Sequence, residues 1–266
     1  EDEEINVGPC VVYPSANKYL RAVLSAEDAP VDFIGYHPYN QDLRKAWASG
    51  DDMRLADALR AVRDTLKRHY EAAAGLHPRA GELPQIASEW NVSMTWYGDK
   101  TAHEMRRSST HALGVAESVF TFAKLGMAAA TFWECPSHES AGMVFDKLTK
   151  HTGDVLVDSK DDGDGLRMYV TRDSDSDEVA FWVLNMSDDD RKLVLKPENL
   201  DGRYRYGERL WLGHPTKKTT LRTQNGLKWQ AEDYRRKVRD MDDGGLELPC
   251  PSACISVLVM NKKKRR

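Results

Sequence analysis

The chain has 266 residues, of which 41% are hydrophobic and 30% charged, a balance that excludes disorder of the whole chain. No apolar run approaches the ~20 residues that a membrane-spanning helix needs. A formal net charge of −4 disfavours a general nucleic-acid binder, and four cysteines are too few for a disulfide framework.

Short apolar strands alternate with amphipathic helices in the first half of the chain. Strands are predicted, in chain order, at residues 5–9, 31–35, 83–88 and 127–132. Helices are predicted at residues 16–25, 52–74 and 104–125. Because the strands largely lack a polar face and helices separate them, this pattern predicts a parallel sheet covered by helices.

The number of strand–helix units limits the architecture of this part. Four units occupy about the first 140 residues, whereas a complete eight-fold barrel typically needs ~250. We therefore expect residues 1–141 to form half of a (β/α)8 barrel. A small open α/β sheet is the alternative, and the pattern alone does not separate the two.

The second half of the chain has closely spaced strands without intervening helices. Strands are predicted at residues 166–171, 179–184, 192–195, 204–212 and 254–260. Turn-rich acidic stretches, such as residues 161–165, separate them. This spacing is typical of an antiparallel sandwich, so residues 142–266 are predicted to be a β-sandwich domain.

A carboxylate stands at the end of the third predicted strand. Glu89 follows the apolar residues 83–88 and is itself followed by Trp90 and Asn91. The C-terminal ends of barrel strands form the active-site face, where a carboxylate can act as a nucleophile or a general base. The equally weighted alternative is a charged residue that opens a surface loop.

Two other strands end in polar and aromatic residues. His37 and Tyr39 follow the second strand, and Trp133 and Glu134 follow the fourth. Taken alone, His37 fits a hydrogen-bonded structural histidine and Trp133 fits a core residue. Taken together with the third strand, these groups predict a ligand site at one end of the sheet, with carbohydrate as the leading ligand.

Metal and phosphate motifs are incomplete. His103-Glu104 lacks the second histidine of a zinc helix, and the acidic run at residues 173–177 lacks the glycine and glutamate of a calcium loop. We expect no metal and no cofactor. Two glycosylation sequons, at Asn91 and Asn185, would matter only in a eukaryotic secretory route.

These strand ends resemble the C-terminal part of a clan A glycoside hydrolase, most closely family 39. His37-Pro38-Tyr39 resembles the element that ends the family's sixth strand, and Glu89 matches the nucleophile at the end of the seventh. Trp133 matches the tryptophan that forms the floor of the sugar site. The resemblance implies a retaining hydrolase of β-xylosides or uronic-acid glycosides. An extracellular or periplasmic location is plausible from the resemblance, although the sequence does not define the compartment.

The chain also departs from that family. Barrel strands one to four are not recognisable, and no Asn-Glu pair, which would carry the family's acid/base, occurs in the sequence. Glu134 is predicted to contact substrate or to pack in a loop rather than to replace that acid/base.

We therefore expect a fragment of a glycosidase whose partners are a carbohydrate and a missing N-terminal half-barrel, from the same precursor or a second chain, but neither nucleic acid nor a membrane. The predicted substrate contacts are His37, Tyr39, Trp90, Asn91, Trp133 and Glu134. The alternative is a non-catalytic carbohydrate-binding or structural protein derived from such an enzyme.

Overall fold

The first half of the chain builds a parallel sheet. The computed structural model describes residues 5–13, 17–92, 99–133, 140–195, 204–234 and 246–262. The strands of this sheet are β1 (Cys10–Val11), β2 (Ile34–Tyr36), β3 (Gln85–Trp90) and β4 (Ala129–Phe132), in that order and all parallel. The predicted parallel sheet is confirmed, with the strand starts shifted by two to five residues and the strand ends by at most two.

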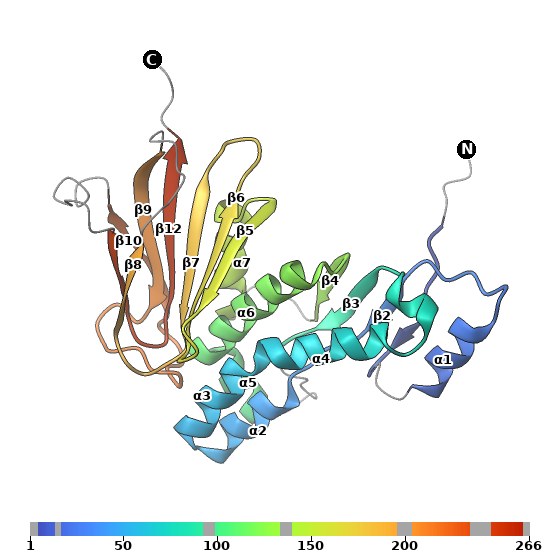
Figure 1. Ribbon diagram of the computed structural model, residues 1–266. Helices are drawn as coiled ribbons and strands as arrows, with labels where there is room; N and C mark the ends of the chain where they lie inside the picture. Colours follow the sequence, from blue (N-terminus) through green and yellow to red (C-terminus); the bar gives the residue numbers. More distant parts are fainter. Residues whose placement is uncertain are drawn as a thin grey trace.

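Among the described residues this sheet is open, with β1 and β4 as its two edges (Figure 1). The predicted strand at residues 5–9 is not a regular strand. It runs along the edge, where the Val7 carbonyl accepts a hydrogen bond from the Asp32 N–H at 2.7 Å, and regular pairing starts only at Cys10. Ile5 is 84% exposed and Val7 is 48% exposed. A sheet edge that no further described strand covers, beside exposed apolar side chains, is a surface that tends to associate.

The helices are more finely divided than the sequence pattern predicts. Their bounds are α1 (Lys18–Ser25), α2 (Gln41–Ser49), α3 (Asp52–Arg60), α4 (Val62–Ala74), α5 (Lys100–Arg106), α6 (Ser109–Leu125) and α7 (Ser140–His151), with a 3-10 turn η1 (Pro78–Gly81). The predicted helix 52–74 is two helices that meet at Ala61. The predicted helix 104–125 breaks at Arg107 and Ser108, because the Ser108 side chain accepts from the His111 N–H and so starts α6 anew.

Two helices were not predicted, although their ends carry recognisable caps. The Asn40 side chain accepts from the N–H groups of Asp42 and Leu43 at the start of α2, and Gly50 ends that helix with φ of 76°. Helix α7 falls on the predicted boundary between the two halves of the chain. Its buried side chains, among them Val144 and Leu148, join the central core.

The two faces of the parallel sheet differ. Val11, Ile34 and Tyr36 lie on the face that packs under α1, α4 and η1 in one apolar cluster. Cys10, Gly35 and Ile86 are paired in register on the opposite face. Cys10 is exposed there, as is Ala129, which pairs with Ile86. Parallel sheets are normally covered on both faces, so this face is an incompletely covered surface.

The second half of the chain is antiparallel, as predicted. One sheet has six strands in the order β10-β9-β12-β7-β6-β5, and a second pairs β11 with β8. The strand bounds are β5 (Val155–Asp161), β6 (Leu166–Arg172), β7 (Val179–Asn185), β8 (Arg191–Leu195), β9 (Tyr204–Gly213), β10 (Lys228–Asp233), β11 (Leu246–Cys250) and β12 (Ile255–Lys262). An apolar cluster that includes Phe181 and Leu248 fills the space between the two sheets.

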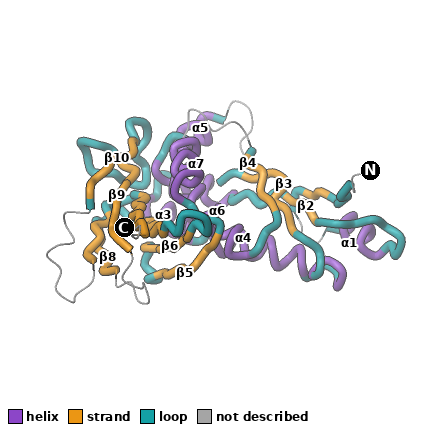
Figure 2. The backbone as a smooth tube through the Cα atoms, turned by 90° about the horizontal axis from the view of Figure 1, so that it is seen from above, coloured by secondary structure: helices purple, strands orange, loops and turns teal. Residues whose placement is uncertain are grey.

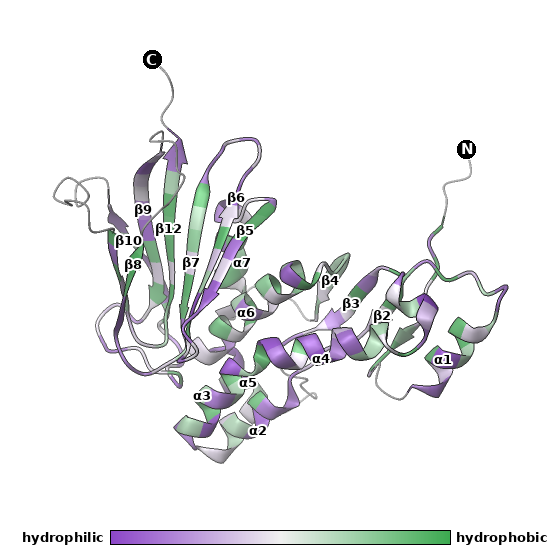
Figure 3. Ribbon diagram, viewed as in Figure 1, coloured by the Kyte–Doolittle hydropathy of each residue, from purple (hydrophilic) through white to green (hydrophobic). Residues whose placement is uncertain are grey.

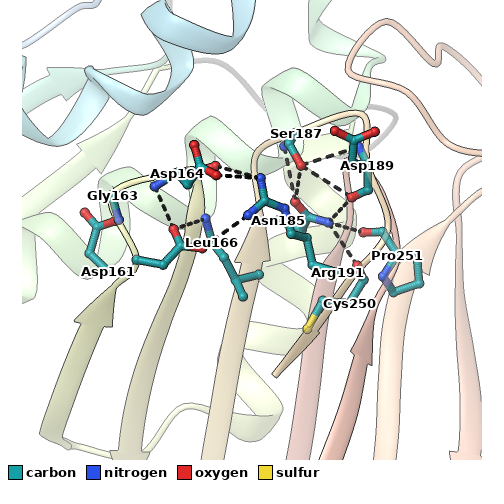
Figure 4. A network of polar contacts seen from close by, with 11 residues as sticks. Asp161, Gly163, Asp164, Leu166, Asn185, Ser187, Asp189, Arg191, Cys250 and Pro251 are labelled. Atoms are coloured by element: carbon teal, nitrogen blue, oxygen red, sulfur yellow. Dashed lines mark hydrogen bonds and ion pairs between the residues drawn. The ribbon is translucent and has the colours of Figure 1, made fainter. Parts of the chain in front are cut away.

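Turns at one end of this domain are fixed by a polar network (Figure 4). The buried Asn185 side-chain amide donates to the carbonyls of Asp189, Cys250 and Pro251 at 2.8, 2.9 and 3.0 Å. These bonds tie the end of β7 to the turn that precedes β12. An amide nitrogen that is buried and makes these hydrogen bonds is not free to carry a glycan. The sequon at Asn185 is therefore not accessible for glycosylation in this fold.

Helix α6 lies between the parallel sheet and the six-stranded sheet (Figures 1 and 2). Its long run of buried side chains joins a single core with β6, β7 and β12, and all of these elements show apolar stretches in Figure 3. Phe120 on α6 stacks on Tyr169 of β6 with ring centroids 4.5 Å apart. This packing explains why α6 is apolar around most of its circumference.

A buried charge pair crosses the same junction. The Arg167 guanidinium of β6 forms an ion pair with the Glu117 carboxylate of α6, which also accepts from the Tyr169 hydroxyl at 2.8 Å. Arg167 donates as well to the Arg60 carbonyl at the end of α3, at 2.6 Å. Burial raises the pKa of the Glu117 carboxyl, and the adjacent Arg167 charge opposes that rise. Glu117 therefore depends on Arg167 to remain buried as a charge, whereas Arg167 has a second carboxylate partner, Asp161, 3.1 Å from its Nε atom.

Replacing Glu117 with alanine is expected to lower the free energy of unfolding by about 1–3 kcal/mol, because the buried Arg167 would lose one charged partner and keep only Asp161, 3.1 Å from its Nε atom. Glu117→Gln keeps an acceptor for Tyr169 and should cost less. Urea unfolding followed by circular dichroism measures both changes. The matched control is Glu104→Ala on α5, whose side chain is exposed. Equal midpoints for the Glu117 and Glu104 variants would contradict this account.

Candidate active site

Glu89 lies at the C-terminal end of β3, facing residues that follow β2. The Tyr39 hydroxyl donates a hydrogen bond to Oε1 of Glu89. The Nε2 atom of His37 lies 3.8 Å from the other carboxylate oxygen. Tyr39 is buried, whereas the Glu89 and His37 side chains are 25% and 21% exposed. A buried hydroxyl thus orients a carboxylate that remains accessible from solvent.

Trp133 stands at the corresponding end of the next strand, β4. Its backbone N–H donates to the Trp90 carbonyl at 2.7 Å, and its side chain is 46% exposed. An exposed indole ring at this strand end offers an apolar face for a sugar ring and a polar edge for a hydroxyl. Glu134, the next predicted contact, lies outside the described residues.

Trp90 and Asn91 occupy different positions from those expected of substrate contacts. Each is only 2% exposed. The Trp90 ring packs edge-on against Phe122 and Phe132 at centroid distances of 5.0 and 4.9 Å. The strand end therefore turns these two side chains into the protein, and they support the site from behind.

Asn91 is the centre of a buried hydrogen-bond network. Its Oδ1 atom accepts from the Val92 N–H at 2.7 Å and lies 2.8 Å from Nε2 of His111 on α6. Its amide nitrogen donates to the Trp133 carbonyl at 3.3 Å. The other ring nitrogen of His111 lies 3.0 Å from the Ser140 hydroxyl at the start of α7. As at Asn185, the side-chain nitrogen of this sequon asparagine is buried and donates a hydrogen bond within the protein.

The protonation state of His111 follows from its surroundings. Burial, together with the positive charge of Arg106, lowers the pKa of His111 from its ordinary 6.5 to about 3. The ring is therefore neutral near pH 7 and has one N–H. Since the Asn91 oxygen can only accept, Nε2 carries that proton. The Ser140 hydroxyl lies 3.0 Å from Nδ1 and donates its single proton to the Arg106 carbonyl at 2.8 Å. Nothing in the sequence distinguishes His111 from any other residue of an apolar helix.

A thiol adjoins the site from β1. The Cys10 sulfur lies 3.5 Å from Nε2 of His37 and 3.0 Å from the Ser88 hydroxyl oxygen. Cys10 is exposed, whereas Cys250 and Cys254 are buried and both are free thiols. Burial raises the pKa of each of these two thiols to about 12, which keeps them protonated.

Two further findings concern the described part of the chain. No group of three or more histidine, cysteine, aspartate or glutamate side chains is placed there to hold a metal ion. No helix within the described ranges is long and apolar enough to cross a bilayer.

Comparison with known proteins identifies the fold. No protein-family model and no curated protein matches the sequence. Among solved structures, the GH51 arabinofuranosidase from Xanthomonas axonopodis pv. citri is 12% identical, with a TM-score of 0.65 over 98% of this chain and 59% of that chain. A family 51 α-L-arabinofuranosidase from Bifidobacterium longum is 13% identical, with a TM-score of 0.65 over 96% and 58%.

A Paenibacillus polymyxa xyloglucanase of family 44 is 12% identical, with a TM-score of 0.54 over 88% of this chain and 47% of that one. The class of fold is therefore that of clan A glycoside hydrolases. The particular likenesses are to families 51 and 44, so membership of family 39 stays a prediction. This chain spans less than two thirds of the length of these three enzymes.

The neutral His111 makes a prediction about pH. The unfolded state takes up a proton at this residue near pH 6.5, whereas the folded state does so only near pH 3. The unfolded state therefore binds more protons within that window, and stability falls as the pH is lowered through it, by at most about 1.4 kcal/mol per pH unit. His111→Gln should remove this part of the slope between pH 4.5 and 7, as measured by urea unfolding at each pH. The control is His103→Gln on the exposed surface of α5. A slope that His111→Gln leaves unchanged would refute the assignment.

Proposed function

We propose that this chain is the C-terminal part of a retaining glycoside hydrolase in which Glu89 is the nucleophile. The observation that carries the proposal is the Glu89 carboxylate at the end of β3, with the Tyr39 hydroxyl on one oxygen and His37 3.8 Å from the other. The clan A fold supports it, because Glu89 matches the position of the nucleophile in the family that the strand ends resemble.

The chemistry assigned to each side chain follows from its position. Glu89 attacks the anomeric carbon and forms a glycosyl-enzyme as the aglycone leaves. Tyr39 holds the carboxylate in orientation, and His37 is within reach to hydrogen-bond a sugar hydroxyl. Trp133 supplies the apolar face on which the ring rests. Asn91 and Trp90 hold this arrangement from the buried side.

The acid/base is proposed to come from outside this chain. Retaining hydrolysis needs a second carboxyl group ~5–5.5 Å from the nucleophile. The sequence has no Asn-Glu pair, the form in which the resembling family presents this group. A missing N-terminal half-barrel, from the same precursor or a second chain, would supply it.

The open sheet supports this completion. Both edge strands, β1 and β4, have a free side among the described residues, and the face that carries Cys10 and Ala129 is exposed. Four additional parallel strands would pair with both edges and cover that face. The enzymes of similar fold have longer chains, of which this chain covers 59% or less.

For the substrate we favour neutral pentosides, either arabinofuranosides or β-xylosides. The similar structures include arabinofuranosidases and a structure solved with xyloglucan. A uronic-acid substrate, which family 39 also suggests, would be expected to meet a lysine or arginine. The described residues that we assign to the site are Glu89, His37, Tyr39 and Trp133, and none of them is a lysine or an arginine.

A substrate that needs neither an acid nor a base tests this proposal directly. Dinitrophenolate leaves without protonation, and azide attacks the glycosyl-enzyme without general-base help. We expect azide-dependent release of dinitrophenolate from 2,4-dinitrophenyl glycosides of arabinofuranose or xylose, with a glycosyl azide of retained configuration. Alkyl glycosides, which have poor leaving groups, should turn over little, because general acid–base assistance typically contributes ~10²–10⁴-fold.

Glu89→Gln should reduce this azide-dependent rate by at least about 10³-fold. The matched control is Glu82→Gln, an exposed glutamate just before β3, which should have no effect. Turnover that survives Glu89→Gln would remove Glu89 as the nucleophile. Sugar binding without azide-dependent turnover would favour the alternative, a non-catalytic carbohydrate-binding protein. Efficient hydrolysis of alkyl glycosides would show that the chain holds a complete site.

A further inference from the structure

A loop of the β-sandwich domain fixes the start of α6. The loop at residues 219–224 joins β9 to β10 and crosses the N-terminus of this helix. The Ser109 N–H donates to the Thr223 carbonyl at 3.0 Å, and the Thr110 N–H donates to the Leu221 carbonyl at 3.2 Å. The Thr110 hydroxyl donates to the same Leu221 carbonyl at 2.7 Å. Backbone groups that would otherwise be unpaired at the helix start are thereby satisfied by the sandwich domain.

His111, the next residue along α6, connects the start of this helix to the candidate site. Its ring is completely buried, with Nε2 2.8 Å from Asn91 Oδ1 and Nδ1 3.0 Å from the Ser140 hydroxyl. One side chain thus joins α6, the start of α7 and the end of β3. The ring is rigid and neutral, so it holds Asn91 by geometry rather than by charge.

Asn91 in turn fixes Trp133 from one side. Its amide nitrogen donates to the Trp133 carbonyl at 3.3 Å, while the Trp133 N–H donates to the Trp90 carbonyl at 2.7 Å. Both peptide groups of Trp133 are therefore held by residues at the end of β3. The indole ring, 46% exposed, is the part of this residue that remains free to meet a ligand.

We infer that His111 is a positioning residue, through which the sandwich loop at residues 219–224 and the start of α6 set the placement of Asn91 and Trp133 at the sugar site. The inference rests on the proposed function for the role of Trp133 as a sugar contact. It gives the β-sandwich domain a part in ordering the site, since its loop determines where α6 begins. The roles of His37, Tyr39 and Glu89 are separate from it.

Hydrogen exchange at single amides tests the placement without reference to catalysis. His111→Leu removes the donor to Asn91, so we expect exchange at the Val92 and Trp133 amides to become about tenfold faster or more. Amides of β7 should keep their wild-type rates. His111→Gln retains a donor for Asn91 and should restore most of the protection. Thr110→Val, which loses the hydroxyl bond to Leu221, should give a smaller change in the same direction and provides a test if His111→Leu fails to fold.

The control is Ser118→Ala, a buried position on the same helix whose hydroxyl bonds only within α6, to the Gly114 carbonyl. It should leave the Val92 and Trp133 amides unchanged. Unchanged exchange at Trp133 in His111→Leu would overturn the inference. Exchange that rises equally in β7 would also overturn it, because the residue would then act on global stability alone.

A kinetic measurement separates this inference from the proposed function. In the azide-dependent reaction of dinitrophenyl glycosides, His111→Leu should raise KM about tenfold and change kcat far less, because Trp133 contributes to binding of the ring. His111→Gln should restore KM. An equal loss in kcat with KM unchanged would overturn the assignment. Absence of turnover in the wild-type chain as well, with the exchange pattern present, would refute the proposed function while supporting the placement of Trp133 by His111.

Discussion

The burial of α6 between two sheets is the constraint on which the rest of the molecule depends. A helix that is buried along most of its length must satisfy most of its polar side chains internally, and two polar side chains of α6 do so by bonding to neighbouring elements. Glu117 pairs with Arg167 in the six-stranded sheet, and His111 bonds Asn91 at the end of β3. The same helix therefore joins the sandwich domain to the strand ends where the candidate site lies.

This arrangement explains how the parallel sheet is held in place. Among the described residues the sheet has two open edges and one poorly covered face, so its own strand pairing is limited; β1 pairs over only two residues. Its covered face packs on α1, α4 and η1 in one apolar cluster. Helix α4 also contributes Val62 and Leu66 to the core that contains the strands of the six-stranded sheet, so this helix links the parallel sheet to the larger core.

The site divides into an accessible set and a buried set. Glu89, His37 and Trp133 are partly exposed at the ends of β2, β3 and β4, where a ligand can reach them. Tyr39 and Asn91 are buried and fix the accessible groups through hydrogen bonds. Such a division is expected of a site whose side chains must keep their orientation before a ligand binds, because each contact that is ordered in advance reduces the entropy lost on binding.

The sequence by itself determined the parallel sheet, the antiparallel sheets and the meeting of Glu89, His37 and Tyr39, since strand alternation and strand ends are local properties of the chain. It also placed Trp133 at the same end. It did not separate the exposed Trp133 from the buried Trp90 and Asn91, because neighbouring residues at a strand end differ in exposure only after the helices have packed. The role of His111 was decided by its contacts with Asn91 at the end of β3 and with Ser140 of α7. The start of α6 is held by a loop more than 100 positions further along the chain, which accepts from the N–H groups of Ser109 and Thr110. Which face of the parallel sheet is left uncovered was likewise a matter of tertiary packing, since covering depends on where α1, α4 and α6 come to lie.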